Sequence, residues 1–248
     1  MPMSSVLVIA AHPDDEVLGC GGTIAKHVQA GDKVVVAILA EGVTSRDPAR
    51  NRDERTDDLS ELARSAQSAN AILGVHALVL HDLPDNRLDS LDRLEVIKLV
   101  EGLIVEHRPD RVYTHHAGDV NIDHRRIHEA VVTACRPIPG HSVKSLLFFE
   151  VPSSTEWQTP GSAPSFTPNW FVDIEETLET KRRALSAYAS EMRRWPHSRS
   201  IEAVTYLARW RGASVGREAA EAFMLGRLIQ DVAVTAKHGV PEAAGSVQ

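Results

Sequence analysis

The sequence has few cysteines, few aromatic residues and no long apolar run, and these scarcities exclude several classes of protein. Its two cysteines, Cys20 and Cys135, cannot form the disulfide framework of a small secreted domain. Both stand among small or apolar neighbours, so we expect packed thiols in a reducing cytoplasm. No apolar run reaches the roughly 18 residues that a membrane-spanning helix needs. The short apolar run near the N-terminus lacks a basic flank, which indicates a strand and not a signal peptide.

Positive charge is also in deficit. The chain carries 27 lysines and arginines against 34 acidic residues, a formal net charge of −7, which argues against a nucleic-acid binder. A length of 248 residues, 43% hydrophobic and 25% charged, suits one soluble α/β domain. We therefore expect a single domain over residues 1–248, with a tail from about residue 235 that frays. The expected partner is a small molecule and neither nucleic acid nor a membrane, and a homo-oligomer is compatible with this composition.

Apolar runs alternate with helical patterns along most of the chain. This alternation predicts a Rossmann-like, mostly parallel α/β sheet with helices on both faces. The expected strands are residues 6–11, 33–40, 76–81, 111–114, 146–151 and 170–173. The expected helices are the one that follows the first strand and residues 51–73, 90–107, 123–135, 174–192 and 201–211, and the last ordered element is residues 217–229. The Pro/Ser/Thr-rich loop 152–169 is expected to border or cover the pocket.

What the chain does have is histidine, with twelve residues, and a distinctive junction after the first strand. The apolar run Val6 to Ala11 stops at His12, and three adjacent acids follow at residues 14–16. The dipole of a helix that starts here favours acids in its first turn, but three neighbouring carboxylates repel one another, and a bound cation would resolve the repulsion. His12 and Asp15 stand three residues apart, so both side chains can point to one side. An imidazole with a carboxylate is a zinc-type ligand pair.

A second histidine-rich stretch follows the fourth expected strand, at residues 114–128. There Asp123 is a plausible helix cap or first-turn acid, and His124 begins a helix on the same edge of the sheet as His12. A catalytic zinc site keeps three protein ligands and one open position for water, and His124 would be the third ligand. His124 and His128 also have the four-residue spacing of His-Glu-x-x-His proteases, but residue 125 is Arg, so the Glu base of that motif is missing.

Glycines at positions 19, 21 and 22 follow the first strand and could suggest a dinucleotide-binding loop. They come too late, inside the helix, whereas the turn itself holds His-Pro-Asp-Asp. We therefore expect these glycines to allow close packing of the helix.

The segment Ala11 to Glu16, Ala-His-Pro-Asp-Asp-Glu, and the later Asp123-His124 pair resemble the LmbE-like or PIG-L family of zinc-dependent N-acetylsugar deacetylases. The similarity extends over roughly residues 4–225. It implies that His12, Asp15 and His124 bind Zn²⁺ and that Asp14 is the general base. Zinc would lower the pKa of its bound water to about 7. Iron, cobalt or manganese can also occupy a His/His/carboxylate site.

The resemblance also suggests candidates for the remaining roles. Several family members have a histidine where this chain has Asn121, whose amide can donate a hydrogen bond to an oxyanion but cannot be protonated. Asp123 is a candidate to orient a histidine. Asp85, in a Leu-Pro-Asp segment, is a candidate substrate contact, although Pro-Asp-Asn is equally typical of a turn.

Two candidates for substrate binding follow from less specific signals. Either His115 or His116 could take over a polarising role next to the substrate, and we select His115. One of Arg50, Arg52 and Arg55 could supply the arginine that many family members carry on the second helix, and we select Arg55.

The sequence thus predicts a metal-dependent hydrolase that removes an N-acetyl group from an amino sugar or glycoconjugate. One alternative keeps the site but changes the substrate to a thiol-conjugate amide or an antibiotic intermediate. A remote alternative is a non-catalytic nucleotide-binding protein on the same fold.

Overall fold

Alternate residues of the central strands belong to two separate hydrophobic clusters, one on each face of the sheet, so the sheet is the middle layer of the fold. In the computed structural model, which describes residues 3–230, Val6 and Val8 of β1 (Ser5–Ala10) belong to one cluster. Leu7 and Ile9 of the same strand belong to the other. A strand buried on both faces needs helices on both sides. The expected fraying tail from residue 235 lies outside the described residues.

Within residues 3–230, the strands form one seven-stranded sheet of order β3-β2-β1-β4-β5-β7-β6. The strands β1, β2 (Lys33–Ala40), β3 (Ala77–Leu83), β4 (Arg111–His115) and β5 (Ser145–Phe149) run parallel. Two further strands extend the sheet: β7 (Ala220–Leu228) pairs antiparallel with β5, and β6 (Trp170–Asp173) pairs antiparallel with β7. The prediction of a Rossmann-like, mostly parallel sheet is therefore confirmed.

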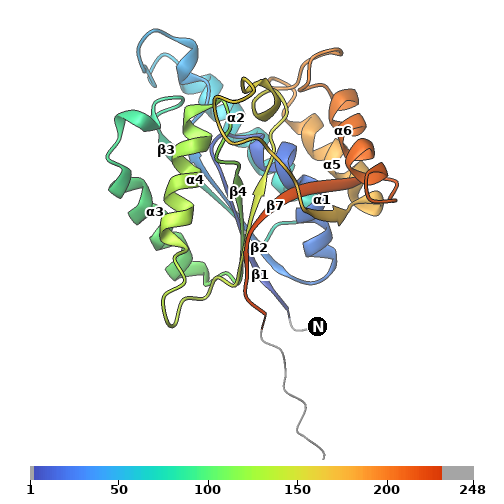
Figure 1. Cartoon of the computed structure of the whole chain (residues 1–248). Helices are drawn as coiled ribbons and strands as arrows, with labels where there is room; N and C mark the ends of the chain where they lie inside the picture. Colours follow the sequence, from blue (N-terminus) through green and yellow to red (C-terminus); the bar gives the residue numbers. More distant parts are fainter. Residues whose placement is uncertain (1–2, 231–248) are drawn as a thin grey trace, which may run out of the picture.

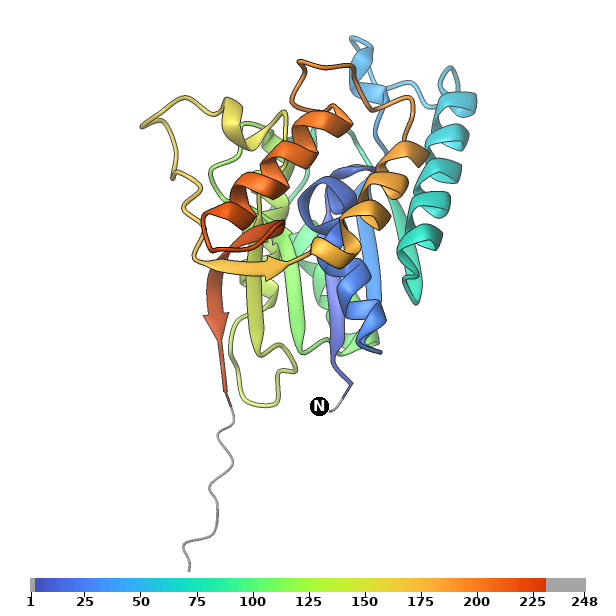
Figure 2. The same cartoon turned by 90° about the vertical axis from the view of Figure 1, so that its right-hand side faces the viewer.

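Helices cover both faces of this sheet (Figures 1 and 2). One face carries α1 (Asp15–Gln29), α2 (Thr56–Leu73), α5 (Leu178–Ala187) and α6 (Ile201–Ala213). The opposite face carries α3 (Arg93–His107) and α4 (Ile122–Ala134). Among the described residues, no helix has both the length and the apolar character to cross a membrane.

The glycines of α1 allow close packing, as the sequence predicts. A Cβ atom at Gly22 would lie 2.8 Å from Cδ1 of Ile174, and a Cβ atom at Gly19 would collide with the ring of Phe149. Both glycines therefore let α1 approach its neighbours more closely than a larger residue would.

Several predicted boundaries are wrong, and the reasons are tertiary. The helix expected over 174–192 is a short 3₁₀ turn, Glu175–Thr177, followed by α5, which ends at Ala187. The next residue, Tyr188, has left the helix, and its hydroxyl donates a hydrogen bond to the buried Glu16 at 2.7 Å. The helix α2 starts at Thr56 and not at residue 51.

Smaller differences concern the ends of other elements. The helix α3 starts at Arg93, where the carboxylate of Asp92 accepts a hydrogen bond from the backbone N–H of Leu94. β3 runs two residues further than expected, to Leu83, and β5 ends at Phe149. The last ordered element, expected over 217–229, is the strand β7.

A buried ion pair ties α1, α5 and β7 together. The ammonium of Lys181 lies 2.6 Å from the carboxylate of Glu221 and also donates to the carbonyl oxygen of Leu18 at 2.9 Å. The same carboxylate accepts hydrogen bonds from the backbone N–H groups of Gly22 at 2.9 Å and Thr23 at 2.7 Å. These contacts satisfy both charges inside the protein.

We predict that Glu221→Ala lowers the free energy of unfolding by about 3–5 kcal/mol, because it leaves the Lys181 ammonium buried without its counter-charge. The control is Glu101→Ala, which removes the exposed Lys98–Glu101 pair and should cost less than about 1 kcal/mol. Urea denaturation followed by circular dichroism measures both values. Equal losses in the two variants would contradict the importance of the buried pair.

Candidate metal centre

Two segments far apart in the sequence meet at one edge of the sheet. The strands β1 and β4 are parallel neighbours, with Val6 opposite Arg111, so their carboxyl ends lie side by side. The helix after β1 covers one face and the helix after β4 covers the other. Such a point, where the strand order reverses and the following helices lie on opposite faces, is where open α/β sheets bind ligands.

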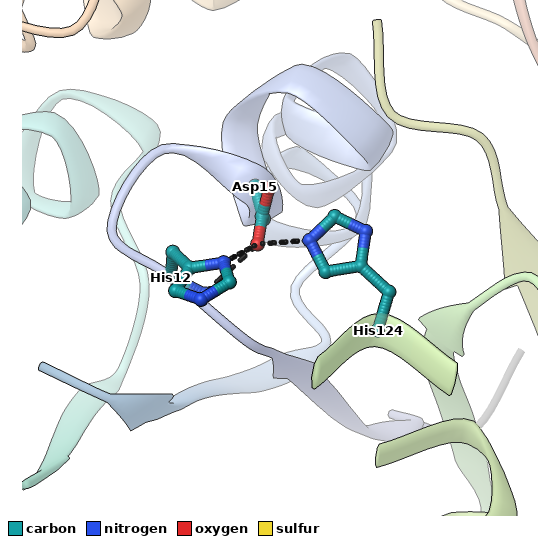
Figure 3. A group of neighbouring side chains, drawn as sticks. All are labelled: His12, Asp15 and His124. Atoms are coloured by element: carbon teal, nitrogen blue, oxygen red, sulfur yellow. Dashed lines mark hydrogen bonds and ion pairs between the residues drawn. The ribbon is translucent and has the colours of Figure 1, made fainter. Parts of the chain in front are cut away.

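Three side chains converge at this point. The Oδ2 atom of Asp15 lies 3.2 Å from Nδ1 of His12 and 3.1 Å from Nε2 of His124 (Figure 3). His12 lies in the turn between β1 and α1, Asp15 is the first residue of α1, and His124 lies in the first turn of α4. One ligand atom from each residue lies within 4.8 Å of the other two, close enough to hold one metal ion.

The chemistry of this donor set fits a divalent transition metal. Two imidazole nitrogens and a carboxylate oxygen are ligands of catalytic zinc sites. The second nitrogen of each imidazole also faces a buried carboxylate: Nε2 of His12 lies 3.0 Å from Asp123, and Nδ1 of His124 lies 3.2 Å from Asp119. Metal-binding histidines are held in this way, because the outer carboxylate fixes the orientation of the ring.

A second group, His12, Asp85 and Asp123, also brings three donor atoms within 4.8 Å. It uses Nε2 of His12, which lies 3.2 Å from Oδ1 of Asp85. This second group contributes only one imidazole. The carboxylate of Asp123 is moreover occupied, since it accepts hydrogen bonds from the backbone N–H groups of Asn86 at 2.6 Å and Leu88 at 3.0 Å. The group around Asp15 is therefore the better candidate for a metal.

Asp14 stands next to this donor set without joining it. Its backbone is left-handed, with φ 115°, and its carboxylate caps no helical N–H group. Its Oδ2 atom lies 3.2 Å from Nη1 of Arg199. Burial raises the pKa of Asp14 well above its ordinary value, against the lowering effect of the Arg199 charge, and the charge of Asp15 raises it further.

Glu16 holds this backbone turn in place. Its carboxylate is buried and accepts hydrogen bonds from the backbone N–H of Asp14 at 3.1 Å, from Asn70 at 2.9 Å and from Tyr188 at 2.7 Å. Burial raises the pKa of Glu16 to about 7, although these hydrogen bonds oppose the rise. Glu16 therefore supports the conformation of Asp14 and faces away from the metal ligands.

A cavity of about 270 Å³ opens above the centre. Polar and charged side chains from several loops predominate among its walls. Its lining residues are His12, Pro13, Asp14, Asp15, Gly42, Val43, Ser45, Arg46, Leu62, Asp85, Asn86, Asn121, His124, Ser153, Ser154, Glu191, Arg193 and Arg199. The start of the loop expected over 152–169 thus borders the cavity through Ser153 and Ser154.

Besides the three candidate ligands and Asp14, two further predicted site residues, Asn121 and Asp85, line this cavity. Asn121 is the N-cap of α4, because its Oδ1 atom accepts a hydrogen bond from the backbone N–H of Asp123 at 2.8 Å. Its Nδ2 atom donates to Asn86 at 3.0 Å. The carboxylate of Asp85 accepts a hydrogen bond from the backbone N–H of Ser45 at 3.0 Å. Burial works against ionisation of Asp85, but the hydrogen bond from His12 lowers its pKa to about 2.

Two of the predicted substrate-binding residues, His115 and Arg55, lie away from the cavity. His115 is fully buried beneath His124, with ring centroids 3.9 Å apart, and its Nε2 atom accepts a hydrogen bond from the backbone N–H of Ala11 at 2.8 Å. Burial lowers its pKa well below the usual value, so the ring is neutral. Arg55 pairs with Asp47 at 2.7 Å and Asp58 at 2.9 Å. The structure therefore does not bring His115 or Arg55 to the surface of the cavity.

Sequence reasoning missed two residues of the site, Arg199 and Asp119. Arg199 stands in a Pro-His-x-Arg-Ser segment, but 185 residues separate it from Asp14 in the sequence. No local sequence pattern predicts a contact over that separation. Asp119 had a signal, since it opens the Asp-x-Asn-x-Asp-His sequence that ends at His124. Its place two residues before an N-cap positions its carboxylate beneath the first turn of α4.

Comparison with known proteins agrees with this site. The family model described as GlcNAc-PI de-N-acetylase, or PIG-L, matches residues 7–135, which contain all three candidate ligands. The chain is 31% identical over 191 residues to the uncharacterized deacetylase YaiS of Escherichia coli, covering 75% of this chain and 90% of that protein. It is 30% identical over 201 residues to a diacetylchitobiose deacetylase of Thermococcus kodakarensis, covering 76% of this chain and 70% of that protein.

One solved structure with the same fold is named for a reaction other than deacetylation, so the fold alone does not identify the reaction. A 4-carboxy-2-hydroxymuconate hydratase of Pseudomonas putida matches with a TM-score of 0.73 and 20% identity, covering 93% of this chain and 100% of that one. Such a likeness establishes the fold and leaves the reaction to the site. The family assignment rests instead on the match over residues 7–135 and on the relatives in sequence. This chain belongs to the PIG-L family.

Proposed function

We propose that this protein is a divalent-metal-dependent deacetylase that removes the N-acetyl group from an amino sugar or glycoconjugate. The proposal rests on one observation above all: a buried carboxylate, Asp14, stands beside a two-histidine, one-carboxylate donor set at the base of a polar cavity. Two relatives in sequence that are named as deacetylases support the reaction. One of them, the diacetylchitobiose deacetylase, supports the class of substrate.

The residues that would hold the metal are His12, Asp15 and His124. When bound, a divalent cation supplies Lewis acidity, which polarises an acyl oxygen and lowers the pKa of water. Zinc is the cation that we propose, and other divalent transition metals suit the same ligands.

We infer that Asp14 moves the proton. Arg199 donates a hydrogen bond to Oδ2 of Asp14 at 3.2 Å, whereas Oδ1 has no hydrogen-bond partner within the described residues 3–230. Oδ1 can therefore take a proton from the attacking water and pass it to the departing amine. A raised pKa suits this role, because it makes the carboxylate of Asp14 a better proton acceptor than that of an ordinary aspartate.

Asn121 is placed to donate a hydrogen bond to the oxygen of the acyl group. Its Nδ2 atom carries two hydrogens, and only one of them is directed to Asn86. The other can stabilise a developing negative charge at the cavity, in the manner of an oxyanion-hole amide. An amide cannot supply a proton, so Asp14 alone handles proton transfer in this proposal.

The walls of the cavity suit a substrate with many hydroxyl groups. Ser45, Asn86 and Ser153 bring hydroxyl and amide groups to its surface, and Asp85 adds an ionised carboxylate. A sugar presents donors and acceptors that such groups can match, whereas an apolar substrate would leave them unpaired.

A panel of acetylated compounds tests the substrate class. We expect the metal-loaded protein to release acetate from N-acetylglucosamine or its oligosaccharides faster than from an N-acetylcysteine thioether, because the cavity offers hydrogen bonds to sugar hydroxyls. Enzymatic detection of acetate measures each rate. Faster release from the thioether would favour the thiol-conjugate alternative.

Removal of the metal tests the centre itself. We expect a chelator to abolish acetate release and Zn²⁺ to restore it. We also expect His124→Ala to bind less than about a tenth of the metal that the wild type binds, because changes to residues outside the ligand set alone weaken metal binding by about 10–100-fold. The control is His76→Ala, because His76 is exposed at the start of β3. Metal content is measured by elemental analysis. Full activity after chelation would contradict the proposal.

The isosteric change Asp14→Asn tests the general base. We expect normal metal content but a fall in kcat of about 100-fold to 10,000-fold, because general-base catalysis contributes about that factor. The control is Asp53→Asn, an exposed carboxylate outside the cavity. Steady-state kinetics with elemental analysis separates loss of chemistry from loss of metal. An unimpaired Asp14→Asn variant would refute the role of Asp14.

A further inference from the structure

Asp119 lies next to the candidate ligand His124, and hydrogen bonds from other residues hold its carboxylate there. Its carboxylate is fully buried. The Oδ2 atom faces Nδ1 of His124 at 3.2 Å and also accepts a hydrogen bond from the hydroxyl of Thr155 at 2.7 Å. The Oδ1 atom accepts hydrogen bonds from the hydroxyl of Ser154 and from the backbone N–H of Asn121, the latter at 2.9 Å.

The direction of the Thr155 hydroxyl follows from its other partner. The backbone N–H of Val151 donates a hydrogen bond to the oxygen of this hydroxyl at 2.8 Å. A hydroxyl has a single hydrogen, and the acceptor within reach is Oδ2 of Asp119. Thr155 therefore donates to the same oxygen atom that faces the imidazole of His124.

The segment that carries these hydroxyls is itself fixed. The carboxylate of Glu156 accepts hydrogen bonds from the backbone N–H groups of Ser153 at 2.7 Å and Ser154 at 3.2 Å. The hydroxyl of Ser153 accepts a hydrogen bond from Nε of Arg199 at 3.0 Å, and the guanidinium of Arg199 in turn contacts Asp14. Residues 153–155, which follow β5, thus contact both Asp119, next to the candidate ligand His124, and Arg199, next to Asp14.

We propose that Thr155 and Ser154 are positioning residues for the metal centre. They hold Asp119 so that it fixes the ring of His124 with Nε2 directed at the site shared with His12 and Asp15. Burial alone explains why Asp119 needs hydrogen bonds. It does not explain why the Thr155 donor and the imidazole of a candidate ligand meet at one oxygen atom. This inference rests on the proposed metal-dependent function.

The test compares Thr155→Val with Thr155→Ser. Valine keeps the volume but removes the hydroxyl, whereas serine keeps the hydroxyl. We expect Thr155→Val to weaken Zn²⁺ binding about 10–100-fold, the effect typical of an outer-shell partner, and Thr155→Ser to stay within about threefold of the wild type. Competition with a chromophoric chelator measures affinity without reference to activity, and the absorption spectrum of the Co²⁺ form reports the ligand geometry.

A matched control separates positioning from stability. The hydroxyl of Thr177 is also buried and donates a hydrogen bond to the carbonyl oxygen of Gly22 at 2.9 Å, within the α1–α5 packing. Thr177→Val should lower the free energy of unfolding and leave the Zn²⁺ affinity unchanged. If Thr155→Val does not fold, Ser154→Ala replaces it, because Ser154 also donates to Asp119 and the same loss of affinity is expected.

The outcomes distinguish this inference from the proposed function. If the wild type binds the metal and Thr155→Val binds it with the same affinity, the positioning role is overturned but the proposed function stands. The same holds for Ser154→Ala where that variant replaces Thr155→Val. A wild type that binds no Zn²⁺, Co²⁺, Fe²⁺ or Mn²⁺ overturns both. An equal loss of affinity in Thr177→Val would show that general destabilisation, and not positioning, weakens the site.

Discussion

The site depends on the burial of negative charge at one edge of a parallel sheet. Buried carboxyl groups are concentrated in and around the centre; they belong to Asp14, Asp15, Glu16, Asp85, Asp119 and Asp123. An ionised carboxylate away from water is unfavourable unless it is paired or hydrogen-bonded. Arg199 and the imidazoles of His12 and His124 supply part of the pairing, and backbone N–H groups supply more. A dication among these groups would lower the cost further, so the charge arrangement itself favours a metal.

The same constraint explains why the first turn of α1 is unusual. Asp14 has a positive φ of 115°, which costs a residue with a Cβ atom about 1–3 kcal/mol. This backbone turns the carboxylate of Asp14 toward the cavity and the carboxylate of Asp15 toward the histidines. The hydrogen bonds of Glu16 offset the strain, and Tyr188 and Asn70 hold Glu16 from the far side. A network of buried polar groups therefore connects α2 and the end of α5 to the conformation of one residue.

Local patterns in the sequence predicted the sheet and the convergence of the three candidate metal ligands, because both depend on short segments. Apolar runs identify strands, parallel strands share one carboxyl edge, and His12 and His124 both lie in segments that follow a strand at that edge. Contacts between distant segments could not be predicted in the same way. The approach of Arg199 to Asp14 depends on how the chain returns after α5, and the end of α5 itself depends on a hydroxyl that binds Glu16.

The candidates that lie away from the cavity illustrate the same limit. His115 was a candidate for a polarising role next to the substrate, but its ring lies under His124 and accepts a hydrogen bond from the backbone N–H of Ala11. Arg55 was chosen by its charge, and two neighbouring carboxylates take up that charge. A position in the sequence says which edge of the sheet a residue approaches. It does not say whether the side chain turns toward the cavity or toward a nearer partner.

The candidate ligands and the cavity wall come from two different sets of segments. The junctions after β1 and β4 carry the candidate ligands and Asp14, whereas the loops after β2, β3 and β5 and the segment around Arg193 supply most of the remaining cavity wall. Loops can change length and sequence without disturbing the strands that hold the ligands. A fold built in this way can keep one reactive centre while its substrate changes, and it can also lose or change the reaction when the junctions change. The hydratase has the same fold and a different named reaction, so the fold by itself does not set the reaction. In this chain, the junctions carry the candidate donor set with Asp14 beside it, so the features that select its substrate should be sought in the loops around the cavity.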